Sequence, residues 1–131
     1  MTDGNKKGKT MATLSAAKIK PGTTPILTVI VDDEDISEAT VYVTIDMKDR
    51  NLVKSTKSGN GDIMLEPIYN GETFVGTQVT AQYSQAETLH LRPGHASLEI
   101  GWVDSEGVAE KSDLARLKIP KTLFRGVMAN G

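Results

Sequence analysis

The sequence contains no cysteine, and this absence excludes several kinds of chemistry together. Without thiols the chain has no disulfide bond, no thiolate nucleophile and no cysteine ligand for zinc. Aromatic residues are also scarce, at 5% of the 131 residues. They do not alternate with arginines, as they do on surfaces that stack nucleic-acid bases. The composition therefore predicts no nucleic-acid partner.

Long apolar runs and catalytic motifs are missing as well. No stretch approaches the ~18 apolar residues of a membrane-spanning helix, so we expect no membrane insertion. The only histidines, His90 and His95, flank the Pro93–Gly94 turn and do not share a helix face, so we expect ordinary surface histidines. The acidic run Asp32–Asp35 lacks the spacing of a calcium-binding loop and is expected to be solvated. We therefore expect no catalytic, cofactor-binding or metal-binding residue, and not an enzyme.

The charge that is present is distributed unevenly. The chain has a net charge of −2, but residues 1–20 hold five lysines and one aspartate, which leaves −6 on residues 21–131. The first residues are polar, rich in glycine and lysine, and without periodicity. We therefore expect a flexible basic N-terminal arm over residues 1–19, a folded domain over residues 20–120 and a C-terminal tail over residues 121–131.

Alternation of apolar and polar residues dominates the expected domain. It is clearest after Gly94, where Ala96, Leu98, Ile100 and Trp102 fall on one face and predict a half-buried strand with Trp102 as a core anchor. The other expected strands are Ile26–Val31, Ala39–Met47, Leu52–Lys57, Ile63–Tyr69, Phe74–Tyr83 and Lys111–Ile119, with Thr13–Lys20 as a further candidate edge strand.

Three local patterns give more specific expectations. The continuous β-branched, apolar run Ile26–Val31 predicts a strand that is buried on much of both faces. Lys54 and Lys57 are expected to point outward, as is typical of an exposed or edge strand. Ser84 and Glu87 have the spacing of a capping box and predict a short helical turn, which Pro93 and Gly94 prevent from continuing.

Seven or eight short strands with one helical turn predict an all-β fold. The regular spacing of strands and turns is typical of an antiparallel β-sandwich, of the immunoglobulin-like or the jelly-roll kind. The chain length suits one domain. The segment Thr122–Met128 is apolar with no obvious partner, and we expect it either to pack across the base of the domain or to dock on a neighbour.

Four segments in a fixed order resemble small phage and prophage virion proteins. They are K-P-G-T-T-P at residues 20–25, D-I-S-E-A-T-V-Y-V-T-I at 35–45, Y-S-Q-A-E-T-L-H-L-R-P-G-H-A-S-L-E-I-G-W at 83–102, and S-E-G-V-A-E-K-S-D-L-A-R-L-K-I at 105–119. The arrangement is similar to the N-terminal β-sandwich of phage baseplate upper proteins, and it covers about residues 20–120.

The resemblance implies a non-enzymatic structural subunit of a bacteriophage particle. It implies a place in the tail or baseplate, with capsid decoration or the base of a head fibre as the alternative, and assembly in the host cytoplasm. Its partners would be other virion proteins, in a homo-oligomer or lattice. The arm of one subunit is then hypothesised to lie on the acidic body of the next. The candidate interface residues are Lys6, Lys7, Lys9, Leu123, Phe124, Val127 and Met128.

Functions of other classes remain open from the residues alone. A carbohydrate-binding or adhesin β-sandwich would be favoured by an exposed aromatic platform, but the few aromatic residues fall mostly on expected inward faces. A small enzyme would be favoured by a sulfate or metal ion bound in a pocket beside His90 or His95.

Overall fold

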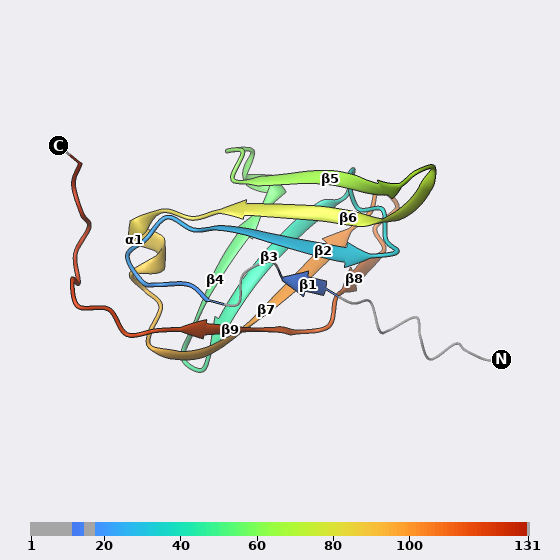
Figure 1. Cartoon of the computed structure of the whole chain (residues 1–131). Coiled ribbons are helices and arrows are strands. Elements are labelled where there is room, and N and C mark those ends of the chain that lie inside the picture. The colour runs from blue at the N-terminus through green and yellow to red at the C-terminus, as the bar shows by residue number, and fades with distance from the viewer. Residues whose placement is uncertain (1–11, 15–17, 131) are drawn as a thin grey trace.

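Nine β-strands form two packed antiparallel sheets in the described part of the chain (Figure 1). The structure is a computed structural model and describes residues 12–14 and 18–130. The strands are β1 (Ala12–Leu14), β2 (Ile26–Asp32), β3 (Thr40–Met47), β4 (Arg50–Ser55), β5 (Ile63–Asn70), β6 (Thr73–Gln82), β7 (Gly94–Val103), β8 (Ala109–Lys111) and β9 (Ala115–Ile119). A four-residue helix, α1 (Gln85–Thr88), connects β6 to β7.

The strand order identifies the kind of sandwich. One sheet has the order β1-β2-β6-β5, and the other has β4-β3-β7 with both β8 and β9 on the far side of β7. This is the order of an immunoglobulin-like sandwich whose second sheet carries one additional edge strand, β4. The prediction of an all-β antiparallel sandwich is confirmed, and its immunoglobulin-like form is the one adopted. The expected number of strands was too low.

The core lies between the sheets and is built by period-2 alternation. In β7 the side chains of Ala96, Leu98, Ile100 and Trp102 are all buried, as predicted. They meet the buried side chains of Val29 and Val79 from the opposite sheet and of Val43 and Leu117 from the strands beside β7.

Strand β2 is buried on one face only, so the expectation of two buried faces was wrong. Leu27, Val29 and Val31 are buried, whereas Ile26 is 60% exposed and Ile30 is half-buried. The outward-facing residues of β2 are all half-buried or exposed. The β-branched residues there suit the extended backbone of an antiparallel strand without requiring burial.

The last expected strand is interrupted at residues 112–114. Strand β8 ends at Lys111 opposite Gly101, and β9 begins at Ala115 opposite Leu98, so three residues face only two of β7. Ser112 fills the gap, since its backbone N–H donates to Ile100 O at 2.8 Å and its Oγ accepts from Ile100 N–H at 3.1 Å. This extra residue makes a β-bulge that the alternation pattern does not indicate.

The boundary expected at residue 19 also needs correction. Strand β1 pairs with β2 and lies within the residues assigned to the arm. Ile19 is 1% exposed in the core, and its N–H donates to Lys118 O at 3.0 Å. Residues 12–14 and Ile19 are therefore parts of the sandwich, and residues 1–11 lie outside the described chain.

Two kinds of feature are absent from the described residues. They include no helix with the length and apolarity needed to cross a membrane. Within the same residues, no three His, Asp or Glu side chains are grouped so that they would hold a metal ion.

Gly76 in β6 is predicted to resist substitution because β2 lies too close. A Cβ atom there would be 2.5 Å from Val31 O, which is backbone in a paired strand and has no freedom to move aside. We expect Gly76→Ala to lower the free energy of unfolding by about 1–3 kcal/mol, measured by urea denaturation. Gly101→Ala in β7 is the control, since its Cβ would meet nothing nearer than Lys111 Cγ at 3.7 Å. Equal losses in the two variants would contradict the steric cause.

Candidate interaction surface

Helix α1 organises one end of the sandwich, the end that the C-terminal segment crosses (Figure 1). Ser84 caps the helix: its Oγ accepts from Glu87 N–H at 3.1 Å, and its own N–H donates to Glu87 Oε1 at 2.8 Å. This confirms the predicted capping box. The helix is too short to be stable alone, so its position depends on contacts with the rest of the chain.

Lys54 makes the first of these contacts, and it is not exposed as the sequence predicted. Its side chain is 7% exposed, and Nζ lies 2.6 Å from Asp62 Oδ2 and 2.8 Å from Glu87 Oε2. Nζ also lies 5.3 Å from the ring centroid of Tyr83. Strand β4 is an edge strand, but α1 and the segment before β5 cover its inner side. Lys57 is exposed, as expected.

The charges at Lys54 support one another. Burial by itself would raise the pKa of Glu87, but hydrogen bonds from Lys54 and Ser84 and the charge of Lys54 outweigh burial and lower it. Burial would lower the pKa of Lys54, but hydrogen bonds to Asp62 and Glu87 and their charges raise it. Both shifts favour the ionised pair, which holds α1 against β4.

Thr88 makes the second contact, with the segment before β2. Its fully buried Oγ1 accepts from the N–H groups of Gly22 at 2.9 Å and Thr23 at 3.1 Å, and donates to Thr23 O at 2.8 Å. One hydroxyl thereby satisfies three backbone groups of a buried turn. No local pattern predicts this role, since a threonine at the end of a helical turn carries no signal of a partner 65 residues away.

Gln85 makes the third contact, with the C-terminal segment. Its Nε2 donates to Met128 O at 2.9 Å, and its Oε1 accepts from Met128 N–H at 2.7 Å. The side-chain amide therefore pairs with both backbone groups of Met128, as a neighbouring strand would. This holds the segment across the base of the sandwich, which was one of the two expected positions.

The apolar side chains of the C-terminal segment remain largely in solvent. Leu123 is 89% exposed, Phe124 61%, Val127 58% and Met128 51%. These four residues, which we call the apolar tail, are the ones that the sequence nominated as interface. Their exposure agrees with that nomination, and their role at an interface stays a prediction. Lys6, Lys7 and Lys9 lie outside the described residues.

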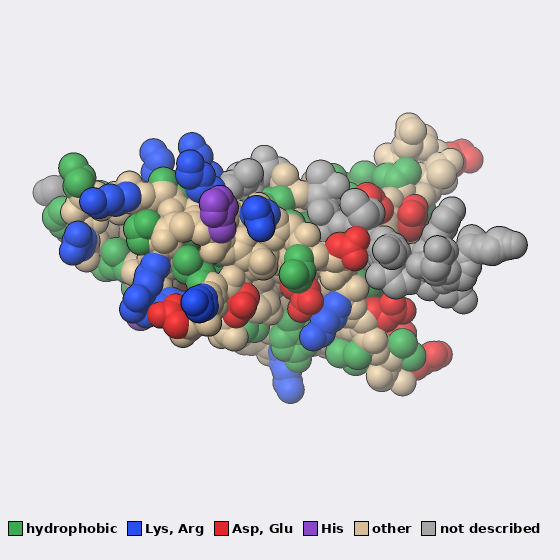
Figure 2. Space-filling view, turned by 90° about the horizontal axis from the view of Figure 1, so that it is seen from below, with side chains coloured by type: hydrophobic (Ala, Val, Ile, Leu, Met, Phe, Trp, Pro, Cys, Tyr) green, Lys and Arg blue, Asp and Glu red, His purple; other side chains and the backbone are tan. Residues whose placement is uncertain are grey.

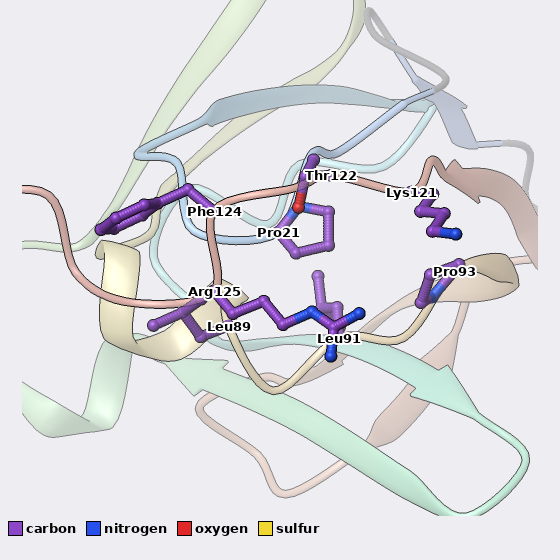
Figure 3. A pocket seen from close by; sticks show the side chains of 8 residues that line it. All are labelled: Pro21, Leu89, Leu91, Pro93, Lys121, Thr122, Phe124 and Arg125. Carbon is purple, nitrogen blue, oxygen red and sulfur yellow. The ribbon is translucent and has the colours of Figure 1, made fainter.

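A hollow of about 340 Å³ separates this segment from the body. Its walls come from Pro21, Leu89, Leu91 and Pro93 on one side and from the C-terminal segment on the other. Figure 3 shows the Arg125 side chain extended along the hollow, while Phe124 points in the opposite direction. His90 and His95 are exposed and do not line this hollow, but His95 lines a separate one of about 500 Å³ together with Asp49 and Arg92.

Gln85→Ala is predicted to release the C-terminal segment without unfolding the domain. The hydrogen bonds lost are exposed, so we expect the free energy of unfolding to fall by no more than about 1 kcal/mol. Hydrogen exchange at the Met128 amide is expected to accelerate, because its acceptor is removed. Gln82→Ala, at an exposed position at the end of β6, is the control. Unchanged exchange at Met128 would show that other contacts hold the segment.

Comparison with known proteins adds little. No family model matches the chain, and no curated protein matches its sequence. Among solved structures, it aligns with the SrpA adhesin R347E mutant from Streptococcus sanguinis at a TM-score of 0.37 and 12% identity. The alignment covers 90% of this chain and 59% of the adhesin chain, so this chain spans less than two thirds of that structure. A similarity this weak carries no argument about function.

Proposed function

We propose that the protein is a non-enzymatic structural subunit of a bacteriophage particle that acts through protein–protein assembly. The observation that carries the assembly role is the apolar tail, a short segment with four large side chains at least half exposed. Burying each of these side chains fully in an interface would gain at most about 1.5–3 kcal/mol, and less where the side chain is already partly covered. A segment held to the body through Gln85 is free to present them to a neighbour.

The assignment to a phage particle depends on the order of the four sequence segments described above. The tail or baseplate is the proposed location, with capsid decoration or the base of a head fibre as the alternative. The sandwich supplies a rigid support in all of these locations, since its two sheets pack around one continuous core.

Analysis of purified particles tests this proposal. Particles induced from a strain that encodes the protein would be separated on a density gradient, digested and analysed by mass spectrometry. We expect its peptides in the particle fraction at a constant ratio to the major capsid protein. Antibody labelling in electron micrographs would then distinguish tail from head. Absence from intact particles, with the protein present in the lysate, would refute the virion assignment.

A further inference from the structure

Charge is separated between the two ends of the sandwich. Lys121 and Arg125 line the hollow beneath the apolar tail, Lys20 directly precedes Pro21 of its wall, and Lys118 lies three residues before Lys121. We call these four residues the basic end. All four side chains belong to exposed residues, and none takes part in an ion pair within the described chain. In Figure 2, Lys and Arg side chains gather toward this end, and Asp and Glu toward the other.

The opposite end is acidic. The β2–β3 and β7–β8 loops meet there, around a hollow of about 390 Å³ whose walls include Asp35, Glu38 and Asp104. The pKa of Glu34 is raised, chiefly by burial and further by the negative charges of Glu110 and Asp33. We call this the acidic end. Its members are Asp33, Glu34, Asp35, Glu38, Asp104, Glu106 and Glu110. None of these carboxylates forms an ion pair within the described residues.

We infer that the basic end, with its apolar tail, docks on the acidic end of a second copy of this chain. The inference rests on the proposed assembly function and names the partner. Unlike charges attract across such a contact, whereas a two-fold contact between two basic ends would bring like charges together. The acidic end also exposes Val108 in the β7–β8 loop, which offers the apolar tail an apolar partner.

A contact between opposite ends is heterologous, so it leaves a free end on each copy. Copies therefore add head to tail and form a closed ring when the rotation between them closes, or an open filament when it does not. Either product differs from a two-fold dimer, which stops at two copies.

Sedimentation velocity of the full chain tests the inference. We expect self-association at an ionic strength of about 0.1 M and dissociation at about 1 M, where the screening length falls from ~10 Å to ~3 Å. The double substitution K121E/R125E cancels the net positive charge of the basic end, and E38K/E106K removes more than half of the net negative charge of the acidic end. Each variant alone is expected to bind itself at least about tenfold more weakly, whereas an equal mixture of the two associates again.

A charge-matched variant shows whether the position of the charges matters. K57E/R116E changes the net charge by the same amount as K121E/R125E, but at exposed residues that do not line the hollow. It is expected to associate like the unchanged protein. Thermal unfolding of each variant confirms that it is folded. Self-association that survives E38K/E106K would overturn the inference. The inference would also be overturned if deleting residues 1–11 abolished association while K121E/R125E still associated. In that case the N-terminal arm would form the contact.

A protein that stays monomeric in every condition would also overturn the inference. It would leave the proposed virion function standing, because a subunit can bind a different protein of the particle. Mass spectrometry of particles decides that function separately.

Discussion

Replacing Ile19 by alanine is expected to lower the free energy of unfolding by about 2–5 kcal/mol. Ile19 is 1% exposed and packs in the core between the sheets. Removing its methyl and methylene groups leaves a cavity that the surrounding strands fill incompletely. Urea denaturation monitored by Trp102 fluorescence would measure the loss, because Trp102 is buried in the same core.

Ile26→Ala is the matched control for this prediction. It is the same substitution at the start of β2, where the side chain is 60% exposed, and we expect a loss below about 1 kcal/mol. If the two variants lost equal stability, burial of Ile19 would not be the cause. This prediction also decides which deletion can be used to test the basic arm. A deletion of residues 1–19 removes β1 and the buried Ile19, so the arm is tested by deleting residues 1–11 only.

Replacing Lys54 by methionine is expected to cost about 3 kcal/mol. Methionine fills a similar volume but leaves Asp62 and Glu87 close together without their shared cation. Both carboxylates are about one third exposed, so water compensates part of the loss and the expected cost lies at the low end for buried pairs. Helix α1 should also loosen, because Glu87 is its link to β4. Lys57→Met, at an exposed position, removes the same charge and should change stability by less than about 0.5 kcal/mol.

The contribution of Lys54 is expected to depend on pH. The pKa of Glu87 is lowered in the folded protein, so its pairing stabilises the fold above its ordinary value of 4.5 and is lost as the pH falls through the folded pKa. The pKa of Lys54 is raised, so its contribution is complete below its ordinary value of 10.5 and is lost as the pH rises through the folded pKa. The difference in stability between the unchanged protein and Lys54→Met should therefore be larger at about pH 7 than below about pH 4.

Glu87→Gln provides the control for the acidic side. It removes the titrating carboxylate, so the remaining difference caused by Lys54→Met should vary less between the two pH values. A difference that stayed constant in the unchanged background would show that the ion pair contributes nothing to stability.

The strand pattern of this protein followed directly from its sequence. Alternation of apolar and polar residues placed Ala96, Leu98, Ile100 and Trp102 in the core, because side chains of a strand point alternately to its two faces. The capping box at Ser84 was equally predictable, since it depends on residues three positions apart. The sequence also indicated an apolar segment without an obvious partner after the last strand, and it left open whether that segment packs across the domain or docks on a neighbour.

Contacts between distant residues were decided by the tertiary structure alone. Lys54 carries the pattern of an outward edge residue, and only the return of the chain at Asp62 and Glu87 encloses it. Ile19, Thr88 and Gln85 likewise take their roles from partners far away in the sequence. The separation of charge arises in the same way, because loops that are distant in the chain meet at one end. Local periodicity thus determined the strands and their inner faces, whereas the packing of one sheet on the other determined which polar side chains became buried and which charges gathered at each end.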